Sequence, residues 1–192
     1  MVILVVGGAG FIGCRVVQSF LENGDKVIVV DDLSTGSKEA VDVKAVFYRM
    51  DIKEERRLEE LFNAFEIDAV IHLGFRSFDF ESVEEPLQYF ENNVSGTIVL
   101  LKVMKRHHVQ FLVWSSSVTS KSLSPYDESL SMVETILSRV DYAHDIKSMN
   151  VRRFGTFEGD MPVMALARAY PLALTLLMEH KVSDVFNVGD EM

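Results

Sequence analysis

The chain has 192 residues and 48% hydrophobic content, which suits one folded domain with a good core and excludes a disordered chain. Its formal net charge of −10, without a dense Lys/Arg cluster, argues against nucleic acid as a partner. The single cysteine, Cys14, cannot form an internal disulfide, so we expect a reducing, cytoplasmic setting. No metal-ligand spacing is present, and we expect no metal site.

The first segments form a unit of strand, glycine turn, helix, strand and acid. An apolar strand, Val2–Val6, runs directly into the turn Gly7-Gly8-Ala9-Gly10-Phe11-Ile12-Gly13, and a helix is predicted over Phe11–Asn23. The second strand, Lys26–Val30, ends in Asp31-Asp32, about 20 residues after the glycines. This order and spacing are typical of a dinucleotide-binding unit. The alternative is a glycine turn in an ordinary α/β protein.

Each residue type in this unit has a physical role. Gly7 or its neighbour allows the tight turn, Gly10 lets the backbone approach a pyrophosphate, and Gly13 lets the helix pack close to the sheet. The helix N-terminus offers free N–H groups to the phosphates. Asp31 can accept ribose hydroxyls and repels a 2′-phosphate, and Asp32 adds a second negative charge. The pattern therefore favours NAD over NADP.

The rest of the chain alternates between short apolar runs and periodic segments. Strands are predicted at Val46–Arg49, Ala69–His72, Phe111–Trp114, Val151–Phe154 and Val185–Asn187, and helices at Lys53–Phe65, Pro86–His107, Tyr126–Val140 and Pro162–His180. This alternation predicts an α/β protein with a doubly wound parallel sheet, a Rossmann NAD-binding fold, in one domain over residues 1–192. Arg168 and Pro171 interrupt the last helix, so we expect it to be buried rather than membrane-spanning.

Motifs along most of the chain resemble those of the extended short-chain dehydrogenase/reductases, in particular the NAD-dependent epimerase/dehydratase family and most closely its UDP-glucose 4-epimerases. Besides the glycine turn, they are Val30-Asp31-Asp32-Leu33-Ser34-Thr35-Gly36, Asp51-Ile52, Val70-Ile71-His72-Leu73, Glu81-Ser82-Val83, Pro86-Leu87, Asn92-Asn93-Val94, Gly96-Thr97, Ser115-Ser116-Ser117, Ser124-Pro125-Tyr126 and Asn187-Val188-Gly189.

The resemblance implies a role for each matching position. At the adenosine side it implies Phe11 and Ile12 at the pyrophosphate turn, Asp31, Leu33, Ser34, Thr35 and Gly36 at the adenosine, and Asp51 and Ile52 beside the adenine. It also implies Leu73, Gly74 and Phe75 beneath the cofactor, Asn93 near the nicotinamide end, and Ser115 as a further cofactor-binding residue. It implies that Ser117 polarises a sugar oxygen and that Tyr126 is the general base. Relatives use bound NAD to oxidise a sugar carbon and then return the hydride to the other face.

The residues alone also allow simpler interpretations of these two positions. Ser115–Ser117 could be a polar strand end. Ser124-Pro125-Tyr126-Asp127 is a complete helix-start pattern, with a Ser cap, a Pro in the first turn and an acid three residues after the cap. Under this interpretation Tyr126 is a packing residue.

One departure from the family concerns catalysis. The family pairs its tyrosine with a lysine four residues later, and this chain has Leu130 there. Residues i and i+4 share a helix face, so the lysine would stabilise the phenolate by roughly 4 kcal/mol at about 4 Å. A free phenol has a pKa near ~10, far from the value a general base needs. We therefore expect turnover to fall by orders of magnitude, unless Lys121 in the preceding loop or, less favourably, Lys147 beyond the helix substitutes for the missing lysine.

A second departure concerns length. Only Gly155–Met161 separates the predicted strand 151–154 from the last helix, and we expect the C-terminal substrate domain to be largely absent. Two functions remain open: an NAD-binding module of the nucleotide-sugar family, or an active NAD-dependent epimerase, dehydratase or reductase with a reduced pocket. Expected partners are NAD, a nucleotide sugar if a pocket remains, and a second copy through helices 86–107 and 126–140.

Overall fold

The computed structural model describes residues 1–117, 124–153 and 160–188, with side chains for 1–116, 124–152 and 163–188. Its strands form one parallel sheet in the order β3-β2-β1-β4-β5-β6-β7. They are β1 (Val2–Val6), β2 (Lys26–Asp31), β3 (Val46–Arg49), β4 (Ala69–His72), β5 (Phe111–Ser117), β6 (Lys147–Arg153) and β7 (Asp184–Val188). The predicted fold class, a doubly wound parallel sheet, is confirmed.

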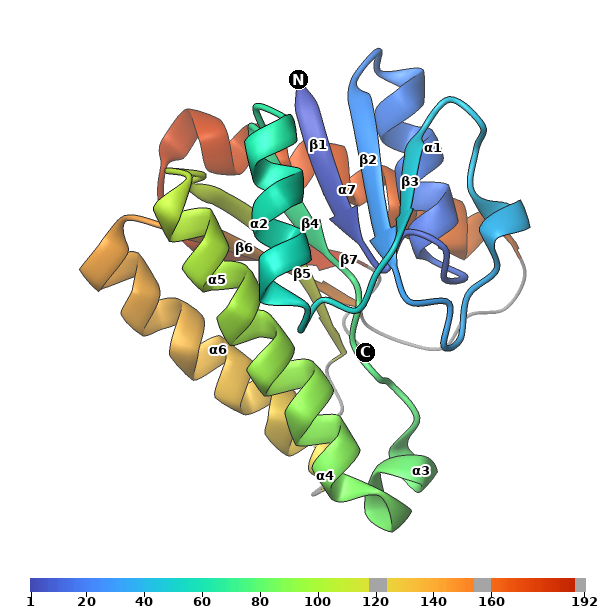
Figure 1. The fold of residues 1–192 in the computed structure, drawn as a ribbon, viewed down its shortest axis with the longest axis vertical. Coiled ribbons are helices and arrows are strands. Elements are labelled where there is room, and N and C mark those ends of the chain that lie inside the picture. Colours follow the sequence, from blue (N-terminus) through green and yellow to red (C-terminus); the bar gives the residue numbers. More distant parts are fainter. Residues whose placement is uncertain (118–123, 154–159, 189–192) are drawn as a thin grey trace.

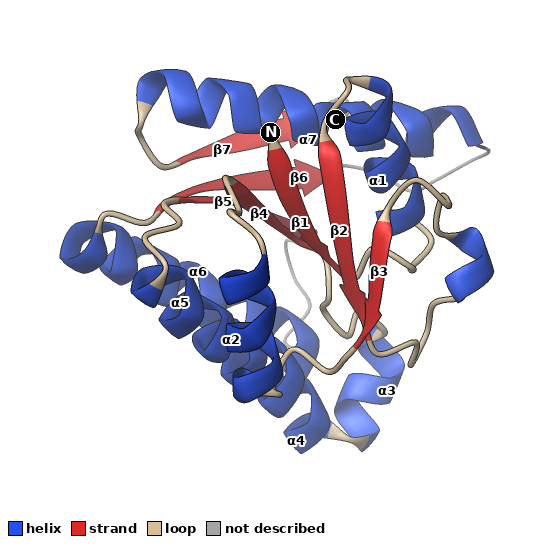
Figure 2. Cartoon of the chain, turned by 45° about the horizontal axis from the view of Figure 1, so that its top comes forward, coloured by secondary structure: helices blue, strands red, loops and turns tan. Residues whose placement is uncertain are grey.

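Helices cover both faces of this sheet (Figures 1 and 2). The helical segments are α1 (Gly13–Glu22), η1 (Lys38–Ala40), α2 (Glu55–Ala64), α3 (Asp79–Glu84), α4 (Pro86–Tyr89), η2 (Phe90–Ser95), α5 (Gly96–Arg106), α6 (Pro125–His144) and α7 (Asp160–His180). Helices α1 and α7 pack on one face, and α2, α5 and α6 pack on the other. The short helices α3 and α4 extend beyond the carboxyl edge of the sheet.

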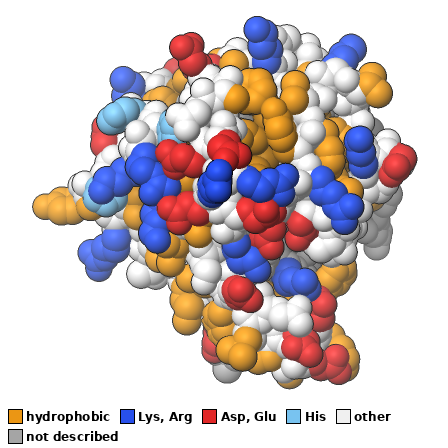
Figure 3. All heavy atoms as spheres, in the orientation of Figure 1, with side chains coloured by type: hydrophobic (Ala, Val, Ile, Leu, Met, Phe, Trp, Pro, Cys, Tyr) orange, Lys and Arg blue, Asp and Glu red, His pale blue; other side chains and the backbone are white. Residues whose placement is uncertain are grey.

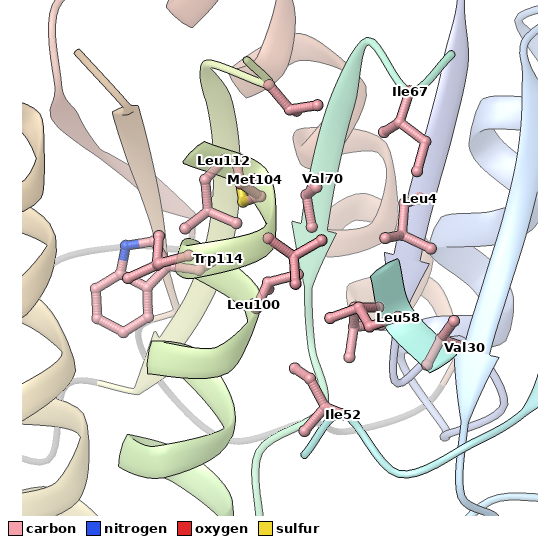
Figure 4. Close-up of a cluster of buried hydrophobic side chains, with 14 of the residues drawn as sticks. Leu4, Val30, Ile52, Leu58, Ile67, Val70, Leu100, Met104, Leu112 and Trp114 are labelled. Carbon is pink, nitrogen blue, oxygen red and sulfur yellow. The ribbon is translucent and has the colours of Figure 1, made fainter. Parts of the chain in front are cut away.

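Alternation along the strands divides the core between these two faces. Leu4 and Val6 of β1 face one cluster, while Ile3 and Val5 face the other, because successive strand side chains point to opposite sides. Figure 4 shows the first cluster, where side chains from neighbouring strands meet those of α2 and α5; the labelled members include Leu4, Val70, Leu112, Trp114, Leu58, Leu100 and Met104. Both faces of the sheet are thus buried.

Several elements differ in extent from the sequence prediction. The predicted helix 86–107 is helical from Pro86 to Arg106, and Phe90–Ser95 within it form a π-helical segment. Strand β6 begins at Lys147, four residues before the predicted start, because its backbone pairs with β5 from Phe111 onward even where its side chains are polar. Helix α6 continues to His144 and ends at Asp145 in the left-handed conformation. The helices α3 and η1 were not predicted.

Helix α7 covers one face of the sheet despite an internal proline, Pro171. Its side chains Leu166, Tyr170 and Leu174 are buried against the sheet and α1. No helix in the described part of the chain is long and apolar enough to cross a membrane.

A histidine is fully buried at the carboxyl end of β4. The hydroxyl of Thr97 donates to the carbonyl of Asn93, so Nε2 of His72 donates to Thr97 Oγ1 at 3.0 Å. Nδ1 of His72 is buried without a partner among the described residues. Burial lowers the pKa of His72 to about 3, so the imidazole is neutral in the folded protein.

This histidine should make stability depend on pH. In the unfolded chain His72 takes up a proton near pH ~6.5, whereas in the folded chain it stays neutral down to about pH 3. The contribution of His72 to the free energy of unfolding is therefore fully present above pH ~6.5 and is lost as the pH falls toward 3. Urea unfolding should show about 2 kcal/mol lost through this residue between about pH 7.5 and 5. His72→Gln should flatten this part of the pH dependence, and exposed His180→Gln should leave it unchanged. An unchanged dependence in His72→Gln would contradict the assignment.

Candidate functional site

A crevice opens at the carboxyl edge of the sheet, where the strand order reverses between β1 and β4. Two adjoining pockets form it, and both are lined by Gly7, Gly10, Thr35, Leu73, Phe75, Ser77 and Phe78. The first pocket extends over β2 toward Asp31, Asp32 and Asp51. The second extends toward β5 and α6 and reaches Ser115, Ser116 and Tyr126.

The glycine turn after β1 is built around close backbone contacts. Gly7 has φ +79°, and a Cβ there would lie 2.6 Å from the backbone nitrogen of Gly74. A Cβ on Gly13 would lie 2.0 Å from the carbonyl oxygen of Gly7. Gly10 is different, because its Cβ would meet only that same oxygen, at an ordinary 3.4 Å. The fold therefore requires glycine at 7 and 13, whereas glycine at 10 keeps open space in the crevice.

The start of α1 presents unused donors to the second pocket. The backbone amides of Phe11, Ile12 and Gly13 donate to no acceptor among the described residues, and these three residues line that pocket. Intrahelical bonding begins with Cys14, whose amide donates to the carbonyl of Gly10 at 3.0 Å. Free amides at a helix N-terminus, with the positive end of the helix dipole, suit an anion such as a diphosphate.

Asp31 at the end of β2 organises the first pocket. Its carboxylate accepts from the amide of Ala9 at 2.9 Å and from the amide of Leu33 at 2.8 Å, which links the glycine turn to the next loop. Each carboxylate oxygen has a second lone pair, so the group can still accept a ribose hydroxyl. Asp32 accepts from the amide of Ser34 at 2.8 Å, and Gly36 packs against the backbone of Ala9.

The far wall of the first pocket follows β3. Met50 and Ile52 are buried there and offer an apolar surface of the kind that suits a flat base. Asp51 lies between them, and its carboxylate accepts from the amide of Lys53 at 2.8 Å. Asp51 and Ile52 thus line the pocket that the sequence associates with adenine.

The second pocket contains the expected catalytic tyrosine. Tyr126 lies in the first turn of α6 with 9% of its surface exposed, and its ring meets Tyr89 edge-on at 6.4 Å between centroids. Leu130, one turn later, is 5% exposed and belongs to the same apolar cluster as Tyr126. At the position where the family has its lysine, this chain therefore has an apolar side chain that packs in the core. The side chain of Ser117 and residue Lys121 lie outside the described residues.

Asn93, expected toward the far end of the cofactor, does not line either pocket. It is fully buried, where its oxygen accepts from the amide of Arg76 at 2.8 Å and its nitrogen donates to Ser129 Oγ at 2.9 Å. The neighbouring Asn92 lines the first pocket and donates to the carbonyl of Gly74 at 3.0 Å. The π-helical segment thus turns the side-chain amides of Asn92 and Asn93 toward the loop after β4. Through its hydrogen bonds to Arg76 and Ser129, Asn93 connects this loop to α6.

Sequence reasoning missed the residues that follow this loop. Arg76, Ser77, Phe78, Asp79 and Glu81 line one or both pockets, together with Ser116 of β5. The sequence signals were the motif Glu81-Ser82-Val83, which marks the segment without indicating how it folds, and the motif Ser115-Ser116-Ser117, which contains Ser116.

Tyr89 of α4 fixes this segment. Its hydroxyl accepts from the amide of Phe78 at 3.1 Å and donates to the Glu81 carboxylate at 2.7 Å. Burial, together with the hydrogen bond to Glu81, raises the pKa of Tyr89 to about 12. Glu81 also pairs with Arg76 at 3.2 Å. Tyr89 is thus a neutral structural phenol that holds α3 against the rim of the crevice.

Charges on the face that includes α2 and α5 alternate in sign (Figure 3). Arg106 pairs with Glu55 at 2.8 Å and with Glu59 at 2.9 Å, and His107 lies 2.7 Å from Glu59. This face therefore shows no broad positive area. Among the described residues, no group of three His, Cys, Asp or Glu side chains could hold a metal ion.

The fold and crevice are those of the Rossmann class, an arrangement typical of dinucleotide-binding proteins. The model of the NAD dependent epimerase/dehydratase family matches residues 3–157, and the chain belongs to that family. Similar proteins include the UDP-glucose 4-epimerases of Lactobacillus helveticus and Streptococcus mutans, each 38% identical over 80% of this chain and 51% of their own length. The chain thus spans about half the length of the curated relatives it matches.

Solved structures agree in fold over nearly the whole chain. The UDP-glucose 4-epimerase of Brucella ovis, in complex with NAD, has a TM-score of 0.90 and 26% identity, covering 98% of this chain and 77% of that one. The enzyme of Stenotrophomonas maltophila, with bound NAD and formylated UDP-arabinopyranose, has a TM-score of 0.89 and 26% identity, covering 98% and 78%. This chain is therefore similar to UDP-glucose 4-epimerases in sequence and in fold.

The glycine geometry predicts opposite effects of two matched substitutions. Gly13→Ala should destabilise the protein by about 2 kcal/mol or more, because the new methyl meets a backbone oxygen that cannot move away freely. Gly10→Ala should stay within about 0.5 kcal/mol of the wild-type free energy of unfolding. Urea denaturation of the two variants checks this difference, and equal destabilisation would contradict it.

Proposed function

We propose that this chain binds NAD in the crevice, with the adenosine in the first pocket, the diphosphate over the glycine turn and the nicotinamide in the second pocket. The free amides of Phe11, Ile12 and Gly13 support a diphosphate at the junction. The carboxylate of Asp31, already oriented by Ala9 and Leu33, supports a ribose in the first pocket. Asp31 and Asp32 together favour NAD over NADP.

We further propose that the chain is primarily an NAD-binding protein with little or no sugar turnover. Bound NAD would supply hydride acceptance and return, whereas proton transfer must come from the chain itself. The observation that carries this proposal is Leu130, buried in the apolar cluster one turn from Tyr126. Without a cation at this position, little favours the phenolate that a general base requires.

The second candidate function is an active NAD-dependent nucleotide-sugar epimerase, dehydratase or reductase that uses Tyr126 and Ser117. The observation in its favour is that Tyr126, although mostly buried, lines the second pocket beside Ser115 and Ser116. Under this function the second pocket would also admit a nucleotide sugar, and Lys121 would be the first candidate for the missing cation.

Measurements on the intact chain discriminate between these functions. NAD(H) should be released when the purified protein is denatured, and NAD should bind to the native apoprotein in calorimetry. Gly10→Ala should weaken this binding at least tenfold while leaving the fold intact, because its methyl occupies the space that the diphosphate needs. UDP-glucose and UDP-galactose should not be interconverted. Interconversion at rates typical of enzymes, about 1 per second or faster, would support the second candidate.

Leu130→Lys tests the role of the missing lysine. If the substrate pocket is otherwise complete, Leu130→Lys should raise epimerisation above the wild-type level by at least tenfold. The buried position predicts a stability cost of a few kcal/mol, so stability is measured in parallel. Leu130→Met is the control, because it keeps the size and apolar character of the side chain and should change neither property strongly. No gain in a folded Leu130→Lys protein would place the defect in the substrate pocket.

We propose that the chain forms a homodimer through the helical segment 86–106 and α6. An apolar groove there is lined by Val94, Met132 and Ile136 together with Asp127, Glu128, Ser131 and Thr135. Met132 is 47% exposed and Leu87 is 80% exposed, which is costly for large apolar side chains that remain in water.

Light scattering should give twice the chain mass for the wild type. Met132→Asp should reduce the mass to that of one chain, because it places a charge in the proposed contact. Leu172→Asp is the matched control, since Leu172 is similarly exposed at 52% but lies on α7, across the sheet. A wild-type protein at the mass of one chain would refute the dimer.

A further inference from the structure

Charge in the second pocket comes from one side chain. Among the described residues that line this pocket, Asp79 alone is charged, and the others are glycines, hydroxyl-bearing residues and apolar side chains. Asp79 is the first residue of α3, and its carboxylate accepts from Ser124 Oγ at 2.9 Å. That serine caps α6, so the carboxylate is tied to the start of the helix that carries Tyr126.

No cation offsets this carboxylate within the described part of the chain. Asp79 forms no ion pair there, and Arg76, which lines the first pocket, is paired with Glu81 at 3.2 Å. The position where relatives carry a lysine is Leu130, which is apolar and buried. The described side chains that line the second pocket therefore carry a net negative charge.

A negative field affects the two oxidation states of nicotinamide differently. The oxidised ring carries a positive charge and the reduced ring is neutral, while the rest of the dinucleotide is the same in both forms. A carboxylate beside the ring therefore stabilises the oxidised form selectively. The α1 dipole and the diphosphate act in every variant alike, so they cancel when variants are compared.

We propose that Asp79 makes the second pocket selective for oxidised over reduced nicotinamide dinucleotide. This inference rests on the proposed NAD binding and extends it, because a protein that holds NAD⁺ in preference to NADH responds to the ratio of the two. Asp79 is thus a specificity-determining residue, separate from the turnover that Tyr126 would support.

The test is the ratio of the dissociation constants for NADH and NAD⁺, measured by calorimetry on the intact apoprotein. The wild type should bind NAD⁺ more tightly. Asp79→Asn should reduce the ratio by about threefold to tenfold, as expected for removing one partly screened charge near another. Glu84→Gln is the control, because it removes an equal charge from the exposed end of the same helix and lines neither pocket. Its ratio should match the wild type.

A second measurement does not depend on any variant. The wild-type preference for NAD⁺ should shrink as ionic strength rises, since the carboxylate is solvent-exposed and salt screens it. Energy transfer from Trp114, the only tryptophan, to reduced nicotinamide gives an independent NADH titration. Equal ratios in wild type and Asp79→Asn, or a ratio insensitive to salt, would overturn the selectivity alone. Failure of both dinucleotides to bind would overturn the proposed function and this inference with it.

Discussion

The crevice depends on an unusually close approach between the turn after β1 and its neighbours. Gly7 lies so near the backbone of Gly74 that a Cβ would come within 2.6 Å of it, and Gly13 lies even closer to the carbonyl of Gly7. These contacts bring the start of α1 down to the carboxyl edge of the sheet, beside the loop after β4. The free amides of α1 therefore face the crevice at the point where the strand order reverses.

Asp31 links this backbone geometry to binding. Because its carboxylate accepts from the amides of both Ala9 and Leu33, the glycine turn and the loop after β2 hold each other in place before any ligand arrives. A binding group fixed by the fold loses little conformational freedom on binding. The same two hydrogen bonds also explain why the acid must follow β2 at this distance from the turn, because Asp31 is an internal structural link in addition to the ribose contact that we propose for it.

The sequence was sufficient for the parts of the site that depend on regular strands and on glycine chemistry. Short apolar runs located each strand, although the polar first half of β6 was missed, and the glycine spacing located the turn. The role of Asn93 could not be foreseen, because its burial depends on a π-helical segment that shifts the helix face locally. Asp79 was missed for a similar reason: α3 is too short for periodicity to mark it, and its position depends on the Tyr89 and Ser124 contacts.

Leu130, which stands where the family has a lysine, and Asp79 in the second pocket act in the same electrostatic direction. Leu130 removes the cation that would favour a phenolate at Tyr126, and Asp79, across the same pocket, makes a further negative charge there less favourable. The field that opposes ionisation of the phenol is the field that favours a cationic nicotinamide ring. The proposed weak base chemistry and the proposed preference for the oxidised dinucleotide are therefore compatible in one site, since among the described residues a carboxylate and no cation lines the second pocket.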